Sequence, residues 1–250
     1  MSLSGHESHF VSCPLTHPPQ LTISLGAGSH FHSQEFNRED PEASCRTPLK
    51  SFELEPGVKA TRVAFINYKG AMDGGIVVTL DDGRVQILDP SDGDILADEQ
   101  LHTQEIMRIS FNKEKTLLFT ASKDNSAKMV DAESLEVLNV YQTDRPVNAV
   151  VCHPTKDHVI LGGGQDAMSV TTTSGAVGKF ECRFYESIYN VEFGRVKGHN
   201  GPINAIGINP DGRSYASGSE DGWIRLHYFD QDYIEREDPV PEEPIDEGEE

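Results

Sequence analysis

Short apolar runs separated by Asp, Asn and Gly fill the middle and the C-terminal part of the chain. Residues 193–230 show the pattern most clearly: Gly198-His199 precedes an expected strand at 203–209, and turns lead to further strands at 215–219 and 224–229. Period-2 runs with turns at this density predict a meander of short antiparallel strands rather than helices.

This unit recurs along the chain. Its turn aspartates are Asp82, Asp124, Asp166 and Asp221, with spacings of 42, 42 and 55 residues. An apolar strand is expected before each Asp and another after it, the third of the latter at residues 168–171. A period of about 40–45 residues is that of a WD-repeat blade, so the sequence predicts an all-β fold of WD-repeat β-propeller blades. The expected blades span residues 52–101, 102–142, 143–196 and 197–235.

The third repeat is longer than the first two by 13 residues, which we place within 178–196. This aromatic segment of mixed charge suits a partner contact or the cover of a blade edge, and the sequence leaves both open. Gly162-Gly163-Gly164 is followed by neither Lys-Ser/Thr nor an expected helix, so it predicts a tight strand end rather than a phosphate-binding loop. The dipeptides expected to end the third strands are Leu88-Asp89, Val130-Asp131, Thr172-Thr173 and His227-Tyr228.

His199, Ser217 and Asp221 hold the positions of a hydrogen-bond network inside a blade, where a His satisfies a buried turn Asp. We assign the same structural role to the other turn aspartates, Asp82, Asp124 and Asp166. A Ser-His-Asp set is also the constellation of many hydrolases. Catalysis needs an exposed nucleophile and an oxyanion hole, and a Ser on an internal strand offers neither. We therefore expect no catalytic residue.

The two ends of the chain differ from the repeats. Residues 1–51 are rich in Ser, His, Pro and Gly without sustained periodicity, so they are expected to be irregular and disordered. Cys13, His30 and His32 lack the second organised ligand pair of a metal site, and neither a metal nor a cofactor is expected. Residues 236–250 form a Pro- and Glu-rich acidic tail that is expected to be disordered.

The formal net charge is −20, of which residues 235–250 contribute −8. Such a surface repels phosphate backbones, so autonomous nucleic-acid binding is not expected and protein partners with basic faces are favoured. Solubility explains the acidity of the tail equally well. The four cysteines are far apart, and neither a signal peptide nor an apolar run of 18 residues occurs. A cytoplasmic protein without membrane contact is therefore expected.

Several stretches are more specific than the repeat itself. They are TASKDNSAK (120–128), TDRPVN (143–148), LGGGQDAMSVTTTS (161–174), GKFECRF (178–184), EFGRVKGHNGPIN (192–204) and SEDGWIRLHYFD (219–230). Together they resemble the family of subunit I of eukaryotic translation initiation factor 3, a WD-repeat family, from about residue 58 to 235.

The resemblance implies a seven-bladed propeller that acts as a non-enzymatic scaffold of that initiation factor complex. It implies contacts with the B and G components of the complex and, through the complex, with the small ribosomal subunit on which the pre-initiation complex assembles. The four repeats correspond to the family's last four blades, so the chain is expected to be an open arc or a truncated ring. The alternatives are a WD-repeat signalling adaptor related to kinase-receptor-associated proteins, and a non-functional truncated form.

The connection between the second and third repeats carries Tyr141, Asp144 and Arg145. Connections of this kind are exposed and available, so these residues are candidate partner contacts, and an ordinary solvated turn is the alternative. An open arc also leaves an apolar sheet face bare at each end. We therefore expect the isolated chain to be unstable or to self-associate.

Overall fold

The computed structural model describes residues 11–12, 20–25, 30–36, 50–66, 74–164 and 180–236. Its elements are β1 (Val11–Ser12), β2 (Gln20–Leu25), β3 (His30–Phe36), β4 (Lys50–Glu53), β5 (Ala60–Ile66), β6 (Gly75–Leu80), β7 (Arg84–Leu88), β8 (Ile95–Gln100), β9 (Ile106–Phe111), β10 (Leu117–Ser122), β11 (Ser126–Asp131), β12 (Val137–Gln142), β13 (Val147–Cys152), β14 (His158–Gly163), β15 (Glu181–Glu186), β16 (Val191–Lys197), β17 (Ile203–Ile208), β18 (Ser214–Ser219), β19 (Ile224–Tyr228) and α2 (Gln231–Glu235). Within these ranges, no helix is long and apolar enough to cross a membrane.

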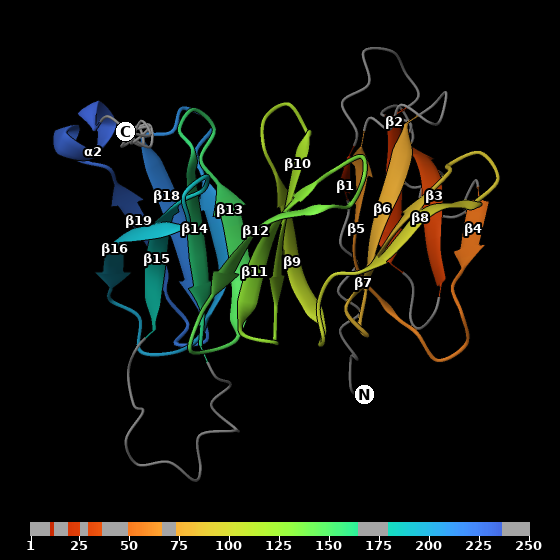
Figure 1. Cartoon of the computed structure of the whole chain (residues 1–250), viewed down its shortest axis with the longest axis horizontal. Coiled ribbons are helices and arrows are strands. Elements are labelled where there is room, and N and C mark those ends of the chain that lie inside the picture. Colours follow the sequence, from red (N-terminus) through yellow and green to blue (C-terminus); the bar gives the residue numbers. More distant parts are fainter. Residues whose placement is uncertain are drawn as a thin grey trace, which may run out of the picture.

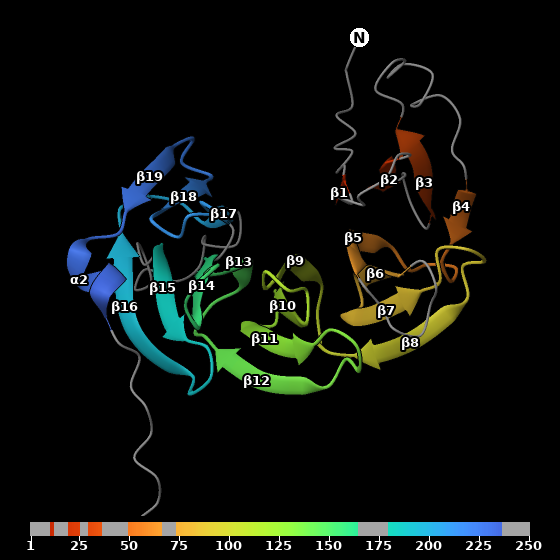
Figure 2. The same cartoon turned by 90° about the horizontal axis from the view of Figure 1, so that it is seen from above.

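The strands form separate antiparallel sheets that stand side by side in an open arc (Figure 1, Figure 2). We call β5–β8 the first blade, β9–β12 the second, β13–β16 the third and β17–β19 the fourth; β1–β4 form an N-terminal sheet. The first strand of each blade lies on the inner side of the arc, where neighbouring first strands contact one another. The predicted all-β fold of propeller blades is confirmed.

Apolar layers between neighbouring blades form the core. Successive residues of a strand point to opposite faces of its sheet, so an internal blade needs apolar residues on both faces. On β10, Leu118 lies in the layer shared with the first blade and Phe119 in the layer shared with the third. A further layer, which includes Phe184, Ile203 and Tyr215, joins the third blade to the fourth.

The third blade differs from the sequence prediction. Its third strand is β15, which pairs directly with β14, whereas residues 168–171 lie outside the described residues. The insertion that lengthens this repeat therefore lies between β14 and β15. Its predicted position within residues 178–196 is wrong. Tyr185-Glu186 ends the third strand in place of Thr172-Thr173: Glu186 Oε1 accepts a hydrogen bond from the Ile188 amide at 3.1 Å.

The N-terminal region also differs from the irregular coil that was expected. Strands β1–β4 lie within residues 11–53, and β4 spans the boundary expected after residue 51. The stretch Gln-Leu-Thr-Ile-Ser-Leu at 20–25 alternates polar and apolar residues, a strand signal that the Ser- and Pro-rich composition obscured. The division of the chain at residues 51 and 235 stays a prediction, and the tail from residue 237 lies outside the described residues.

The turn between the second and third strands of a blade needs a left-handed residue after its Asp. Gly83, Asn125 and Gly222 hold this place, with φ of 91°, 67° and 81°. At Gly83 a Cβ atom would lie 2.2 Å from the carbonyl oxygen of His102, because the connection into the second blade crosses the turn. At Gly222 a Cβ atom would meet nothing within 4 Å.

This pair of glycines separates backbone strain from crowding. We expect Gly222→Ala to lower the free energy of unfolding by about 1–2 kcal/mol, the cost of a left-handed Ala. Gly83→Ala adds a clash with backbone and should cost about 2–4 kcal/mol. Urea unfolding of both variants measures the difference, and equal costs would contradict the packing described at Gly83.

Candidate functional site

A hydrogen-bond network closes the turn of the fourth blade. His199 Nε2 lies 2.8 Å from the hydroxyl of Ser217, and His199 Nδ1 lies 3.1 Å from Asp221 Oδ2. The same carboxylate accepts a hydrogen bond from the backbone amide of Asn200 at 2.9 Å, and Oδ1 accepts one from the amide of Trp223 at 3.0 Å. The network ties the connection that enters the blade to the turn between β18 and β19.

The second blade contains the same network, of which the sequence pattern predicted only Asp124. His102 Nδ1 lies 2.9 Å from Asp124 Oδ2, and His102 Nε2 lies 2.8 Å from the Thr120 hydroxyl. The His-to-hydroxyl and His-to-Asp separations are 18 and 22 residues in both blades. That shared spacing is the signal that could have identified His102 and Thr120 from the sequence.

Burial lowers the pKa of His102, although the charge of Asp124 opposes this, so the imidazole is neutral at pH 7. Burial works against the ionised form of Asp124, but the Ser126 hydroxyl and His102 outweigh it and lower its pKa. A neutral His102 satisfies both neighbours when Nδ1–H donates to Asp124 and Nε2 accepts from Thr120. In the fourth blade the Asn200 amide is the largest cause of an Asp221 pKa of about 2.

The order hydroxyl, His, carboxylate in both networks is that of a hydrolase triad. Ser217 and Thr120 are both 0% exposed, so neither hydroxyl can reach a substrate from solvent. A triad works only when its nucleophile and an oxyanion hole meet the scissile carbonyl. The geometry therefore favours a structural role, in which the network stabilises the turn of the blade, over catalysis. Among the described residues, no group of three His, Cys, Asp or Glu could hold a metal ion.

The first blade fastens its turn differently. Asp82 accepts hydrogen bonds from the backbone amide of Arg84 at 3.0 Å and from Arg84 Nε at 2.7 Å. Arg84 also pairs with Glu55 at 2.8 Å and with Asp98 at 3.2 Å. The hydrogen bond to Glu55, followed by that to Asp82, raises the pKa of Arg84. Asp82 thus lies in a surface ion-pair cluster and not against a His.

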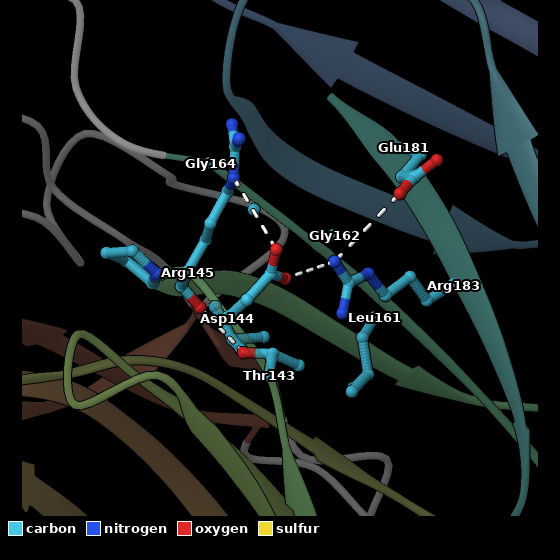
Figure 3. A pocket seen from close by; sticks show the side chains of 11 residues that line it. Thr143, Asp144, Arg145, Leu161, Gly162, Gly164, Glu181 and Arg183 are labelled. Carbon is cyan, nitrogen blue, oxygen red and sulfur yellow. Dashed lines mark hydrogen bonds and ion pairs between the residues drawn. The ribbon is translucent and has the colours of Figure 1, made fainter. Parts of the chain in front are cut away.

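In the third blade, Asp166 lies outside the described residues, and Asp144 precedes it by 22 residues, at the position of the His in the other networks. Asp144 Oδ1 pairs with Arg183 on β15. Figure 3 shows this pair between Arg145, 3.9 Å from Asp144, and Glu181, 3.9 Å from Arg183. Burial opposes ionisation of Asp144, but Arg183 outweighs it and lowers the Asp144 pKa.

The three candidate partner contacts lie in different surroundings. Tyr141 is on β12 with 0% of its surface exposed, and its hydroxyl donates to the Ser187 carbonyl at 2.8 Å. Its expected place in an exposed connection is therefore wrong. The Asp144 side chain is 52% exposed and that of Arg145 is 17% exposed. Of these three candidates, Asp144 and Arg145 can meet a partner without unpacking of the blade, and Tyr141 cannot.

The hollow beside Asp144 is small. Its volume of ≈ 20 Å³ is room for about one water molecule, and Gly162, Gly163 and Gly164 line one side. A Cβ atom at Gly163 would lie 2.0 Å from the Pro146 carbonyl oxygen, so glycine is needed for this close approach of strands. The hollow is a feature of the surface and does not enclose a small-molecule ligand.

A larger cavity of ≈ 270 Å³ lies where β4 meets the first blade. It is lined by the buried side chains of Phe52 and Leu88 and by the exposed acids Glu53, Glu55 and Asp92. Carboxylates beside apolar side chains suit a cationic side chain better than an anion. Because Arg84 already pairs with Glu55, the negative charge of this lining is partly neutralised from within the chain.

Comparison with known proteins gives a consistent result. The family model described as EIF3I matches residues 29–237. "Eukaryotic translation initiation factor 3 subunit I" of Rattus norvegicus is 46% identical over 168 residues, which are 67% of this chain and 52% of that protein. The protein of the same name from Nematostella vectensis is 49% identical over 164 residues (66% and 51%), and that from Bombyx mori is 43% identical over 196 residues (78% and 58%). The chain spans about half the length of the curated relatives it matches.

The buried His102 makes the fold sensitive to acid. Its folded pKa is lower than that of the unfolded chain, so the unfolded state binds more protons and stability falls as the pH drops below about 6.5. Proton NMR should show the His102 ring, identified by its loss in His102→Gln, titrating below pH 6.5. Because Asp124 raises this pKa, Asp124→Asn should move the midpoint further down. A midpoint at or above 6.5 would contradict the burial of a neutral ring.

Proposed function

This chain belongs to the family of subunit I of eukaryotic translation initiation factor 3, and on that basis we propose that it is a non-enzymatic scaffold of that initiation factor complex. The match of the family model over residues 29–237 carries the proposal. In this role the chain supports assembly of the pre-initiation complex on the small ribosomal subunit in the cytoplasm.

The use of polar groups inside the blades supports a scaffold rather than an enzyme. In the second and fourth blades, the hydroxyl and imidazole groups hydrogen-bond to each other in networks that stabilise the turns. The hydroxyls of Thr120 and Ser217 are fully buried. The rigid strands instead present their edges and turns to solvent, which is how repeat proteins offer contact surfaces. The formal net charge of −20 disfavours direct binding to RNA. Contacts with the ribosome then run through other components of the complex.

We assign the partner contact to the turn that leads into the third blade, at Asp144 and Arg145, with the B component of the complex as the partner and the G component nearby. The Asp144 carboxylate is half exposed, so it can accept a further ion pair from a basic partner while it stays paired with Arg183. The ion pair with Arg183 also holds Asp144 in one place before binding. Preorganised charges of this kind reduce the cost of association.

Capture from cells tests the proposal as a whole. A tagged full chain should co-purify with the B and G components of the initiation factor and should sediment with small ribosomal subunits in a sucrose gradient. Co-purification with a membrane receptor kinase would support the signalling adaptor instead. Recovery of the folded chain without any other component of the initiation factor would support a truncated form that has lost the function.

A charge reversal at Asp144 tests the contact itself. Asp144→Lys should weaken capture of a peptide from the C-terminal segment of the B component by at least ~1 kcal/mol, or about fivefold in Kd. Isothermal titration calorimetry measures the effect. Asp157→Lys, at an exposed acid between β13 and β14, is the matched control and should leave the affinity unchanged.

The swapped pair Asp144→Arg with Arg183→Asp distinguishes a direct contact between Asp144 and the partner from a role of the ion pair in supporting the turn. It keeps an ion pair between the two positions but moves the negative charge from the turn to β15. If Asp144 meets the partner, the swapped chain binds as weakly as Asp144→Lys. Full recovery of binding would show that the pair only supports the turn. Unchanged binding in Asp144→Lys would remove Asp144 from the interface.

A further inference from the structure

The cavity of ≈ 270 Å³ beside β4 lies between two sheets and not at an open end of the arc. Its lining comes from β4 and the residues after it, from β7, and from the turn that leads into β8. Figure 2 shows β4 and β8 on the outer side of the arc. Cavities that hold a whole small molecule measure about 300–1,000 Å³, whereas one water needs about 10–15 Å³. The volume therefore suits a single long side chain of another protein.

The turn between β7 and β8 is held in one shape. The Gly93 amide donates to the Asp89 carbonyl, and the Asp89 amide donates to the Asp94 carbonyl, both at 2.9 Å. Gly93 has a φ of 88°, and a Cβ atom there would lie 2.9 Å from Cδ1 of Phe52. The turn and β4 thus pack closely beside the cavity. A wall that is already ordered loses little conformational freedom when a partner binds.

Apolar side chains supply part of the lining. Phe52 and Leu88 are 5% and 4% exposed, so they belong to the packed layer between the sheets. Ile95, at the start of β8, is 53% exposed. The lining therefore offers apolar surface that the methylene groups of a long side chain can cover.

Acids of the same lining supply negative charge. Glu53 and Asp92 are exposed, whereas Glu55 pairs with Arg84 at 2.8 Å. Asp92 Oδ1 accepts a hydrogen bond from the Asp94 amide at 3.0 Å, which orients the carboxylate. An ionised carboxylate has about four lone-pair sites, so Asp92 can accept further hydrogen bonds from a cationic group.

The charge around the cavity has the same sign. Residues 81–100 contain seven acids and one base, Arg84. Glu55, Asp82 and Asp98 all pair with that base, so it does not reverse the local charge. A negative field of this kind attracts basic segments and repels phosphate groups.

We propose that this cavity binds one lysine or arginine side chain from a basic segment of a partner protein. The methylene stem packs on Leu88 and Ile95, and the charged end pairs with Asp92 and Glu53. A neutral apolar side chain would leave the acids without a counter-charge, and an anion would be repelled. The site lies on the first blade, with the second blade between it and Asp144, so it does not rest on the contact assigned there.

Methyl NMR of the full chain tests the proposal with N-acetyl-arginine amide as the probe. We expect the δ1-methyl signal of Ile95, identified by its loss in Ile95→Val, to shift and saturate. A probe of this size should bind with a Kd on the order of 1 mM. N-acetyl-citrulline amide has nearly the same shape without the charge, and we expect it to leave the signal unchanged. Titration with N-acetyl-lysine amide then shows which of the two cations binds more tightly.

A matched pair of variants locates the charge that binds the probe. Asp92→Asn should weaken binding of the arginine probe at least ~5-fold, because it removes a carboxylate of the cavity. Asp211 is an exposed acid in a turn of the fourth blade, and its Oδ1 accepts a hydrogen bond from the Arg213 amide at 2.8 Å. Asp211→Asn removes the same charge and the same kind of hydrogen bond elsewhere, so it should leave the affinity unchanged.

Three results would overturn the proposal. The first is equal binding of the citrulline probe, and the second is an equal loss of affinity in Asp92→Asn and Asp211→Asn. The third is a missing saturable shift of Ile95 at ~20 mM probe, or an equal shift at Ile188, which is 55% exposed on the third blade. An equal shift would show general attraction to an acidic surface. The comparison of probes uses the parent chain, so it decides the matter even when a variant fails to fold.

Discussion

The fold depends on the burial of both faces of each sheet. A sheet of three or four short strands has little stability alone and becomes stable when apolar layers cover it on either side. The alternation along β10 meets this demand, because Leu118 faces the first blade and Phe119 the third. The inner blades satisfy the condition through their neighbours. The fourth blade satisfies it on one side, where Phe184 and Tyr215 join it to the third.

Polar groups then fix how each blade meets the connection that enters it. In the second and fourth blades a His links a strand hydroxyl to the turn carboxylate, and in the first blade Arg84 replaces the His. The third blade uses Asp144 and Arg183 at the corresponding end. These four arrangements share a charge-assisted hydrogen bond, but they differ in which polar groups are exposed to solvent. The His networks are buried, whereas the Asp144 side chain is half exposed to solvent.

The sequence predicted most of the fold because the blade period is regular and its turn residues are explicit. The prediction failed where the local composition obscured a strand pattern, as at residues 20–25, and where an insertion shifted the repeat, as in the third blade. The 42-residue spacing that leads to Asp166 suggested a strand just after it, but the sheet takes β15 instead. The spacing of Asp89, Asp131, Glu186 and Tyr228, at 42, 55 and 42 residues, would have located the insertion correctly. Burial of Tyr141 could not be predicted, because it depends on the turn after β15 that lies against β12.

The turns at Gly83 and Gly222 have the same backbone shape but different surroundings. At Gly83 the crossing chain leaves no room for a side chain. A substitution there is therefore opposed by steric crowding as well as by the positive φ. At Gly222 only the left-handed backbone matters, and Asn, which holds this place in the second blade, meets that requirement. Over evolutionary time the two positions should therefore diverge at different rates. Position 83 remains glycine for as long as another blade follows it, while position 222 is free to drift among the few residues that tolerate this conformation.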